Sequence, residues 1–113
     1  MDVPLAKYIV LVPLCTNNGA PVASEILVDF QDEMLRLGGG YTIAGTVEGA
    51  YRMADGTTKI DHSLQYWICV PATAVEELTS IVARLGALLG QESMYMEITG
   101  GVVALIPPKQ VET

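Results

Sequence analysis

The segment LGGGYTIAGTVEGAY, residues 37–51, is rich in strand-forming residues yet contains five glycines, and the turn signal MADGTT follows it at residues 53–58. An Asp-Gly pair between two β-patterned runs is the strongest short-range indication of a β-hairpin. A two-residue turn at Asp55-Gly56 would fix the register of both strands. The expected cross-strand pairs are Ala54 with Thr57 beside the turn and, on a face toward the helices, Tyr51 with Ile60, Val47 with Leu64 and Ile43 with Ile68.

The glycines of this segment have two expected uses. The register places Gly49 opposite His62 and Gly45 opposite Tyr66, so each glycine would leave room for a ring of the neighbouring strand. They would also allow a long hairpin to bend. The glycines at 38–40 would end a helix and let the chain reverse tightly into the strand.

The segments around the hairpin predict two helices and three further strands. The run KYIVLVPL suits a strand buried on both faces, while two longer segments show apolar residues at helical spacing. Gly100-Gly101 predicts a turn between two short strands near the end of the chain. The expected elements are strands at 7–14, 92–99 and 102–106 and helices at 21–37 and 73–89.

This order of elements predicts an α+β fold. Strand, helix, strand, strand, helix, strand is typical of a ferredoxin-like βαββαβ sandwich, with an antiparallel sheet and two helices on one face. The run VVALI would add an extra C-terminal strand. With 113 residues, we expect residues 1–113 to form a single domain.

Charge and composition exclude several classes of partner. Half of the residues are apolar and 17% are charged, which favours a folded globular protein. The formal net charge is −7, and its six basic residues argue against nucleic-acid binding. The opening MDVPLAKYIVLVPLC is too short for a membrane span and lacks a signal-peptide pattern. We therefore expect no nucleic-acid or membrane partner and a cytoplasmic location.

The sheet face away from the helices is the expected functional surface. Periodicity does not decide whether Ile9 and Leu11 or Val10 and Val12 of the first strand lie there. Glu97 or Tyr95 would contribute from the far side of the sheet. The hairpin strands would contribute Thr42, Ala44, Thr46, Glu48, Ala50 and Arg52 and, across from them, Asp61, Ser63, Gln65, Trp67 and Cys69.

We expect this half-apolar face or the C-terminal edge strand to form a homo-oligomer. Exposed apolar patches and uncovered edge strands usually indicate a partner. A second subunit over the face would enclose a cleft with an aromatic wall and convergent polar groups, which is typical of a small-molecule site. The same side chains would also suit the polar rim of an interface. The candidate ligand-binding residues are Glu48, Arg52, Ser63, Gln65 and Trp67.

Other chemically active residues give little indication of a site. His62 is the single histidine, and adjacent Asp61 would point to the opposite face, so packing or a local hydrogen bond is favoured over catalysis. No ligand spacing for a metal occurs, and no cofactor motif is found. We expect the first and third strands to run parallel and side by side, so that Cys15 and Cys69 at their C-terminal ends would approach each other. Two ordinary free thiols in a reducing compartment are favoured over a redox pair.

Several short motifs resemble a broad family of small bacterial and phage proteins of unknown function. The quoted residues are GGYT at 39–42, Gly-x-Tyr at 49–51, Asp61, a Tyr-centred strand at 66, and QES at 91–93. The chain departs from the family pattern with Tyr51 in place of a Trp and Gly38 in place of a Phe. The resemblance implies a ferredoxin-like α+β fold and no particular activity.

Three functions fit these observations. The favoured one is a non-catalytic oligomeric module that binds a small ligand or a protein partner, with a regulatory role, because no nucleophile and base can be paired. The second is a cofactor-independent enzyme with a cleft between subunits, in which Glu48 or His62 accepts a proton. The third is a purely structural assembly protein.

Overall fold

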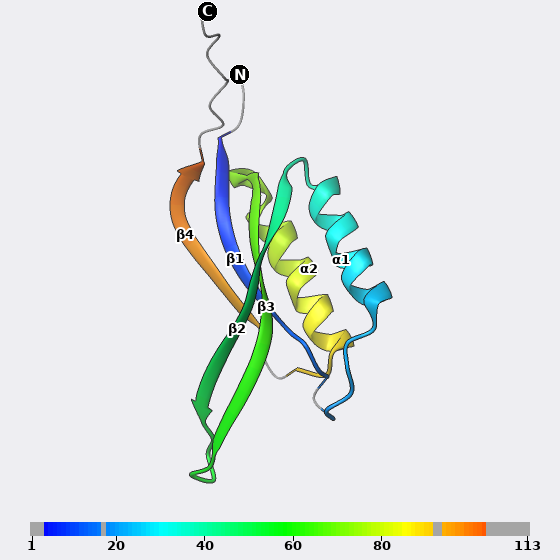
Figure 1. Ribbon diagram of the computed structural model, residues 1–113. Coiled ribbons are helices and arrows are strands. Elements are labelled where there is room, and N and C mark those ends of the chain that lie inside the picture. The colour runs from blue at the N-terminus through cyan, green and yellow to red at the C-terminus, as the bar shows by residue number, and fades with distance from the viewer. Residues whose placement is uncertain (1–3, 17, 92–93, 104–113) are drawn as a thin grey trace, which may run out of the picture.

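The computed structural model describes residues 4–16, 18–91 and 94–103. These residues form a four-stranded sheet and two α-helices, with a short 3-10 helix ahead of the second α-helix (Figure 1). None of the described helices is long and apolar enough to cross a membrane. In chain order the elements are β1 (Leu5–Pro13), α1 (Ser24–Arg36), β2 (Gly40–Arg52), β3 (Thr58–Pro71), η1 (Ala72–Ala74), α2 (Val75–Leu88) and β4 (Tyr95–Val103).

The strands form one antiparallel sheet in the order β2-β3-β1-β4. Both helices lie on the same face of this sheet, and none of the described elements covers the other face (Figure 1). The predicted α+β class, with an antiparallel sheet and two helices on one face, is therefore confirmed. We call the uncovered side the open face.

The core lies between the sheet and the helices. Val10 and Val12 are fully buried there, which assigns Ile9 and Leu11, one residue out of phase, to the open face. The predicted helical stripes pack against this core, except that Leu88 is 68% exposed. The buried core residues are Tyr8, Val10, Val12, Phe30, Met34, Tyr66, Ile68, Val70, Leu78, Ile81, Val82, Leu85 and Leu89.

Tyr66 is the largest fully buried side chain, and its hydroxyl is satisfied inside the core. The Phe30 ring packs edge-on against it at 5.3 Å between centroids. Gln31 donates a hydrogen bond to the Tyr66 hydroxyl at 3.0 Å and accepts one from the Tyr41 hydroxyl at 3.3 Å. A buried polar group costs stability unless it is paired, so this network ties α1 to the β2–β3 hairpin.

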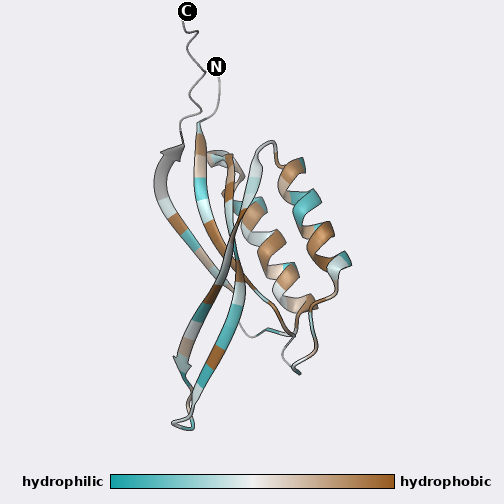
Figure 2. Cartoon of the chain, viewed as in Figure 1, coloured by the Kyte–Doolittle hydropathy of each residue, from teal (hydrophilic) through white to brown (hydrophobic). Residues whose placement is uncertain are grey.

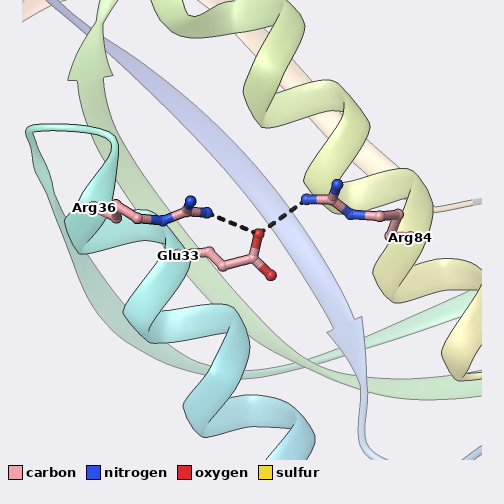
Figure 3. Close-up of polar contacts among 3 residues, drawn as sticks. All are labelled: Glu33, Arg36 and Arg84. Carbon is pink, nitrogen blue, oxygen red and sulfur yellow. Dashed lines mark hydrogen bonds and ion pairs between the residues drawn. The ribbon is translucent and has the colours of Figure 1, made fainter.

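The two helices are also linked on their outer side. Glu33 of α1 accepts hydrogen bonds from Arg36 at 3.3 Å and from Arg84 of α2 at 3.0 Å (Figure 3). The guanidinium groups are well exposed, so each pair contributes at most about 1 kcal/mol. Helix packing therefore depends mainly on the apolar core.

The hairpin turn contains three residues, so the predicted two-residue turn is wrong. The Met53 amide donates to the Thr57 carbonyl at 2.8 Å, and Gly56 has φ +87°, which suits glycine. The Asp55 carboxylate accepts hydrogen bonds from the Thr57 hydroxyl at 2.6 Å and the Thr57 amide at 2.9 Å, and these bonds lower the pKa of Asp55 from its ordinary value.

The longer turn shifts the register of Gly45 to Arg52 by one residue. Tyr51 pairs with Lys59 rather than with Ile60, and Val47 pairs with Ser63 rather than with Leu64. Since strand side chains alternate between faces, this shift moves the second half of β2 to the other side of the sheet. The predicted pairs of Gly49 with His62 and Gly45 with Tyr66 are wrong for the same reason.

A β-bulge at residues 43–45 reverses the effect for the first half of β2. Ile43 pairs with Tyr66 and Gly45 with Gln65, so one extra residue is inserted between two neighbouring pairs. Gly45 has φ +111°, a conformation that residues with a side chain rarely adopt. Tyr41 and Ile43 consequently lie on the same side as the core residues Tyr66 and Ile68.

The last described strand also differs from expectation. A turn at Gly100-Gly101 was expected, but β4 runs without interruption from Tyr95 to Val103. The pairing with β1 is irregular there, because Tyr8 pairs with Ile98 while Ala6 pairs with Val102. The two glycines thus accompany a bulge and not a turn. Residues 104–106 of the expected extra strand lie outside the described part of the chain.

The β2–β3 hairpin extends beyond the two helices as a two-stranded arm (Figure 1). Figure 2 shows that polar segments dominate this arm and that isolated apolar segments interrupt them. Ile60 is 57% exposed and Tyr51 is 48% exposed. Neither face of the arm is therefore buried in the core.

We predict that Gly39→Ala destabilises the fold by roughly 1–3 kcal/mol, as overpacking does. A Cβ at position 39 would collide with the carbonyl of Cys69 and lie 2.8 Å from the Cα of Val70, and both are backbone atoms. Gly40→Ala is the matched control, since nothing lies within 4 Å of its added Cβ. Chemical denaturation of both variants gives the comparison, and equal midpoints would contradict the close approach.

The register predicts which engineered cysteine pair can be bridged. Ala50 and Ile60 are direct cross-strand partners, whereas Ala50 and Asp61 lie on opposite faces. Because a disulfide requires Cα atoms about 4.4–6.8 Å apart and converging Cβ vectors, Ala50→Cys with Ile60→Cys should oxidise to an internal disulfide. Ala50→Cys with Asp61→Cys is the control and should stay reduced. Peptide mapping after mild oxidation identifies the bridged pair. A bridge in the control pair would contradict the register described here.

Candidate functional site

The open face receives alternate side chains from all four strands. Ile9 of β1 lies between Trp67 of β3 and Glu97 of β4, and Leu11 lies between Gln65 and Tyr95. Paired residues share a face, so these side chains form one continuous surface. The structure thus places three of the expected candidates, Ser63, Gln65 and Trp67, on the open face.

The other two candidates, Glu48 and Arg52, do not join them. Glu48 pairs with His62 across the strands, and its Oε1 lies 3.0 Å from His62 Nε2 on the opposite face of the arm. Arg52 donates a hydrogen bond to the Gly56 carbonyl at 2.7 Å and so belongs to the turn. The expectation that they lie on the open face was wrong, because the three-residue turn shifts the register by one.

Trp67 is held by two neighbours on the open face. Its indole Nε1 donates to Gln65 Oε1 at 2.7 Å, and the Lys7 ammonium lies 4.1 Å from the ring centroid. The Trp67 side chain nevertheless stays 39% exposed. An amphipathic ring that is oriented but still exposed is a typical contact residue for a partner.

Two adjoining hollows, of about 430 Å³ and about 340 Å³, lie on the open face where the arm leaves the body of the sheet. We call the two hollows together the sheet groove. Ser63, which is 9% exposed, lies at its base, and Glu48 borders it although its carboxylate is bonded to His62. The residues common to both hollows are Leu11, Tyr51, Asp61, Ser63 and Tyr95.

Aromatic rings and carboxylates line the sides of the sheet groove together with apolar residues and Lys59. Tyr51 and Tyr95 come from the two outer strands and are 48% and 51% exposed. Asp61 and Glu97 add two carboxylates, and Lys59 Nζ lies 3.7 Å from Asp61 Oδ1. Faces of aromatic rings attract cations, and carboxylates pair with them. The arrangement therefore suits a small ligand that combines an apolar or aromatic part with positive charge.

Sequence reasoning missed Tyr51, Asp61 and Gln91 as residues of the same site. Tyr51 was expected to face the helices, and the shifted register places it on the open face instead. A signal for the correct grouping existed in the quoted motifs, since Gly-x-Tyr, Asp61 and the QES segment each supply one residue to the larger hollow. Tyr95 was expected from the far side of the sheet, where it does lie.

The remaining candidates form no second site. His62 lies on the helix side of the arm, as expected, and its ring nitrogen is bonded to Glu48. Cys15 and Cys69 were expected to approach each other, but β1 and β3 run antiparallel, and Cys69 pairs with Lys7 at the opposite end of β1 from Cys15. Both are free thiols. Within the described ranges, no three His, Cys, Asp or Glu side chains are grouped as metal ligands.

Comparisons with known proteins identify a similar fold but no related sequence. No known family model matches the chain, and no curated protein is significantly similar in sequence. Among solved structures, the chain is similar to a phage SAM lyase in complex with S-methyl-5'-thioadenosine. The TM-score is 0.60, the match covers 90% of this chain and 87% of that chain, and 16% of the residues are identical. This similarity shows that the two chains share a fold.

Proposed function

We propose that the sheet groove binds a small adenosine-containing sulfonium or thioether, of the class of S-adenosylmethionine and S-methyl-5'-thioadenosine. The observation that carries the proposal is the pairing of two tyrosines with two carboxylates in one groove: Tyr51, Tyr95, Asp61 and Glu97. The phage SAM lyase of the same fold supports this ligand class, since it is in complex with S-methyl-5'-thioadenosine.

The chemistry of such a ligand matches the groove in three respects. A purine ring stacks on tyrosine, and each such contact contributes about 1–3 kcal/mol. A sulfonium is a cation without hydrogen-bond donors, so it is bound best by ring faces and by nearby carboxylates such as Asp61. The two hollows, at about 430 Å³ and about 340 Å³, lie within the size of small-molecule sites.

The residues of the family resemblance support the same location. Tyr51, Asp61 and Gln91 come from three separate short motifs, and all three line the larger hollow. They are brought there by β2, by β3 and by the segment that follows α2. Polar side chains from separate segments that converge on one hollow mark a candidate ligand site.

A second candidate function is cleavage of the sulfonium, which the similarity to a SAM lyase favours. In S-adenosylmethionine, the bond between sulfur and the side-chain carbon would break, and its electron pair would stay on sulfur to give S-methyl-5'-thioadenosine. The four-carbon fragment would close through its own carboxylate oxygen. No external oxidant or base is required, so the groove would act by holding the reacting carboxylate in line with the carbon.

We further propose that the chain is a homo-oligomer with a ferredoxin-like arrangement. In support of the arrangement, β3 lies between β1 and β2 and is antiparallel to both. In support of the assembly, a second copy over the open face would cover Trp67 and the exposed arm, which packs on neither α1 nor α2. The groove would then be a cleft between copies, while the edge strand β4 offers an alternative contact.

We predict that S-methyl-5'-thioadenosine and S-adenosylmethionine bind saturably and stabilise the fold. Stabilisation should follow the logarithm of ligand concentration over the dissociation constant, about 2.7 kcal/mol at a hundredfold excess. Tyr51→Ala should weaken binding by about fivefold to a hundredfold, as expected for a lost stacking contact. Ile60→Ala is the control on the opposite face of the same arm, outside both hollows, and should bind normally. Calorimetry and thermal unfolding measure both.

The same samples separate binding from turnover. Formation of S-methyl-5'-thioadenosine from S-adenosylmethionine, followed by chromatography, would identify a lyase, and its loss in Asp61→Asn would place the reaction in the groove. Saturable binding without product would favour a non-catalytic ligand-binding module. Absence of binding by both compounds at millimolar concentration would overturn the proposed ligand class.

We predict that the native mass is at least twice the 12.1 kDa of a single chain. Trp67→Asp should shift the protein toward monomer, because it removes the apolar ring and places a carboxylate, which must lose its hydration, at the proposed interface. Trp67→Phe retains the aromatic contact and is the control. Native mass spectrometry measures both, and a wild-type monomer at micromolar concentration would contradict assembly through the open face.

A further inference from the structure

Gly49 lies in the part of β2 that lines the smaller hollow of the sheet groove. Its φ is outside the positive region in which glycine is required, and it pairs regularly with Asp61 of β3. Nothing in the backbone at this position therefore demands a glycine. A side chain at position 49 would be compatible with the strand itself.

What occupies the space beside Gly49 is the tip of the Tyr51 side chain. A Cβ at position 49 would lie 2.8 Å from the Tyr51 hydroxyl oxygen, 3.0 Å from Cε2 and 3.1 Å from Cζ. Residues two apart in a strand share a face, so the Tyr51 ring lies back along β2 and over Gly49. The tip of the Tyr51 ring thus occupies the space that a side chain at position 49 would fill, and we call this space the seat of the ring.

This seat fixes the level at which the Tyr51 hydroxyl stands. Asp61 is the direct cross-strand partner of Gly49, and the hydroxyl is the Tyr51 atom that comes nearest to the Gly49 position. The ring therefore carries its hydroxyl back to the level of the Gly49–Asp61 pair, and Tyr51 and Asp61 line both hollows. If the ring stood upright, the stacking surface and the hydroxyl would leave the groove.

We infer that Gly49 is a positioning residue, whose missing side chain allows Tyr51 to lie in the groove as a ring platform and hydroxyl donor beside Asp61. The ligand role of Tyr51 in this inference rests on the proposed function. The geometric part, that Gly49 seats the ring, does not depend on any ligand. The two parts are therefore tested by separate measurements.

The first measurement needs no ligand. The ring current of a tyrosine shifts the resonances of nearby protons, so one Gly49 Hα of the full wild-type chain should lie outside the usual range in the NMR spectrum. Tyr51→Ala should return it to the usual range. In Gly49→Ala, the Tyr51 ring resonances should move while the unfolding midpoint stays close to wild type, because only the far end of a flexible side chain is displaced. An unshifted Gly49 Hα would overturn the seat.

The second measurement uses S-methyl-5'-thioadenosine as the probe. Gly49→Ala should weaken its binding by about tenfold, as expected for one displaced aromatic contact. In a Tyr51→Ala background, the same substitution should cause no further loss, because residues that act through one another are non-additive. Gly40→Ala is the matched glycine of the same strand, with open space around its Cβ, and should bind normally.

The outcomes separate this inference from the proposed function. If wild type binds no probe but the Gly49 Hα shift is present, the ligand class is wrong and the seat stands. If wild type binds and Gly49→Ala weakens binding equally in the presence and absence of Tyr51, Gly49 acts on its own and its positioning role is overturned.

Discussion

The hydrogen-bond register of the β2–β3 hairpin is the constraint on which the rest of the molecule depends. Side chains alternate along a strand, so a shift of one residue exchanges the two faces of the sheet. The three-residue turn places Tyr51 and Val47 on the open face, and the bulge before Gly45 then returns Tyr41 and Ile43 to the helix side. Without the bulge, a β2 that kept Tyr51 in the groove would lose Tyr41 from the Gln31 network. The bulge lets one strand serve the core at one end and the groove at the other.

The length of the hairpin explains why the groove lies where it does. Beyond the helices the sheet is reduced to two strands, and such ribbons are marginally stable alone. The arm is stabilised by local devices: the Asp55 carboxylate fixes the turn through Thr57, and Glu48 bonds His62 across the strands. These contacts are exposed and individually weak, so they set the shape of the arm more than they stabilise the protein. A second copy over the open face would supply the burial that the arm lacks.

The sequence was sufficient for the class and the position of the elements but not for the register. Helical spacing and the Asp-Gly signal predicted both helices and the hairpin, because these depend on local pattern and turn chemistry. The size of the turn depends on whether Met53 or Ala54 pairs with Thr57 as the last pair before it, and the structure has Met53. Both choices leave two strands with a similar alternation of apolar and polar residues. That choice of one residue moved Glu48 out of the predicted site, while a bulge that periodicity does not reveal decided the face of Tyr41 and Ile43. The prediction was correct for Ser63, Gln65 and Trp67. The apolar residues of β3 had shown which alternate positions of this strand face the helices and which face away.

The glycines of β2 and of the turn before it illustrate three different physical requirements in one short segment. At Gly39 the requirement is contact between backbones, since the Cys69 carbonyl occupies the place of a side chain. At Gly45 it is the backbone conformation of the bulge. At Gly49 it is the position of another side chain, because only the tip of Tyr51 fills the space. The first two are needed for folding and register, whereas the third concerns only the shape of the groove. A glycine that neither the backbone nor the core requires, beside a ring that lines a groove, is therefore an argument for function at that groove.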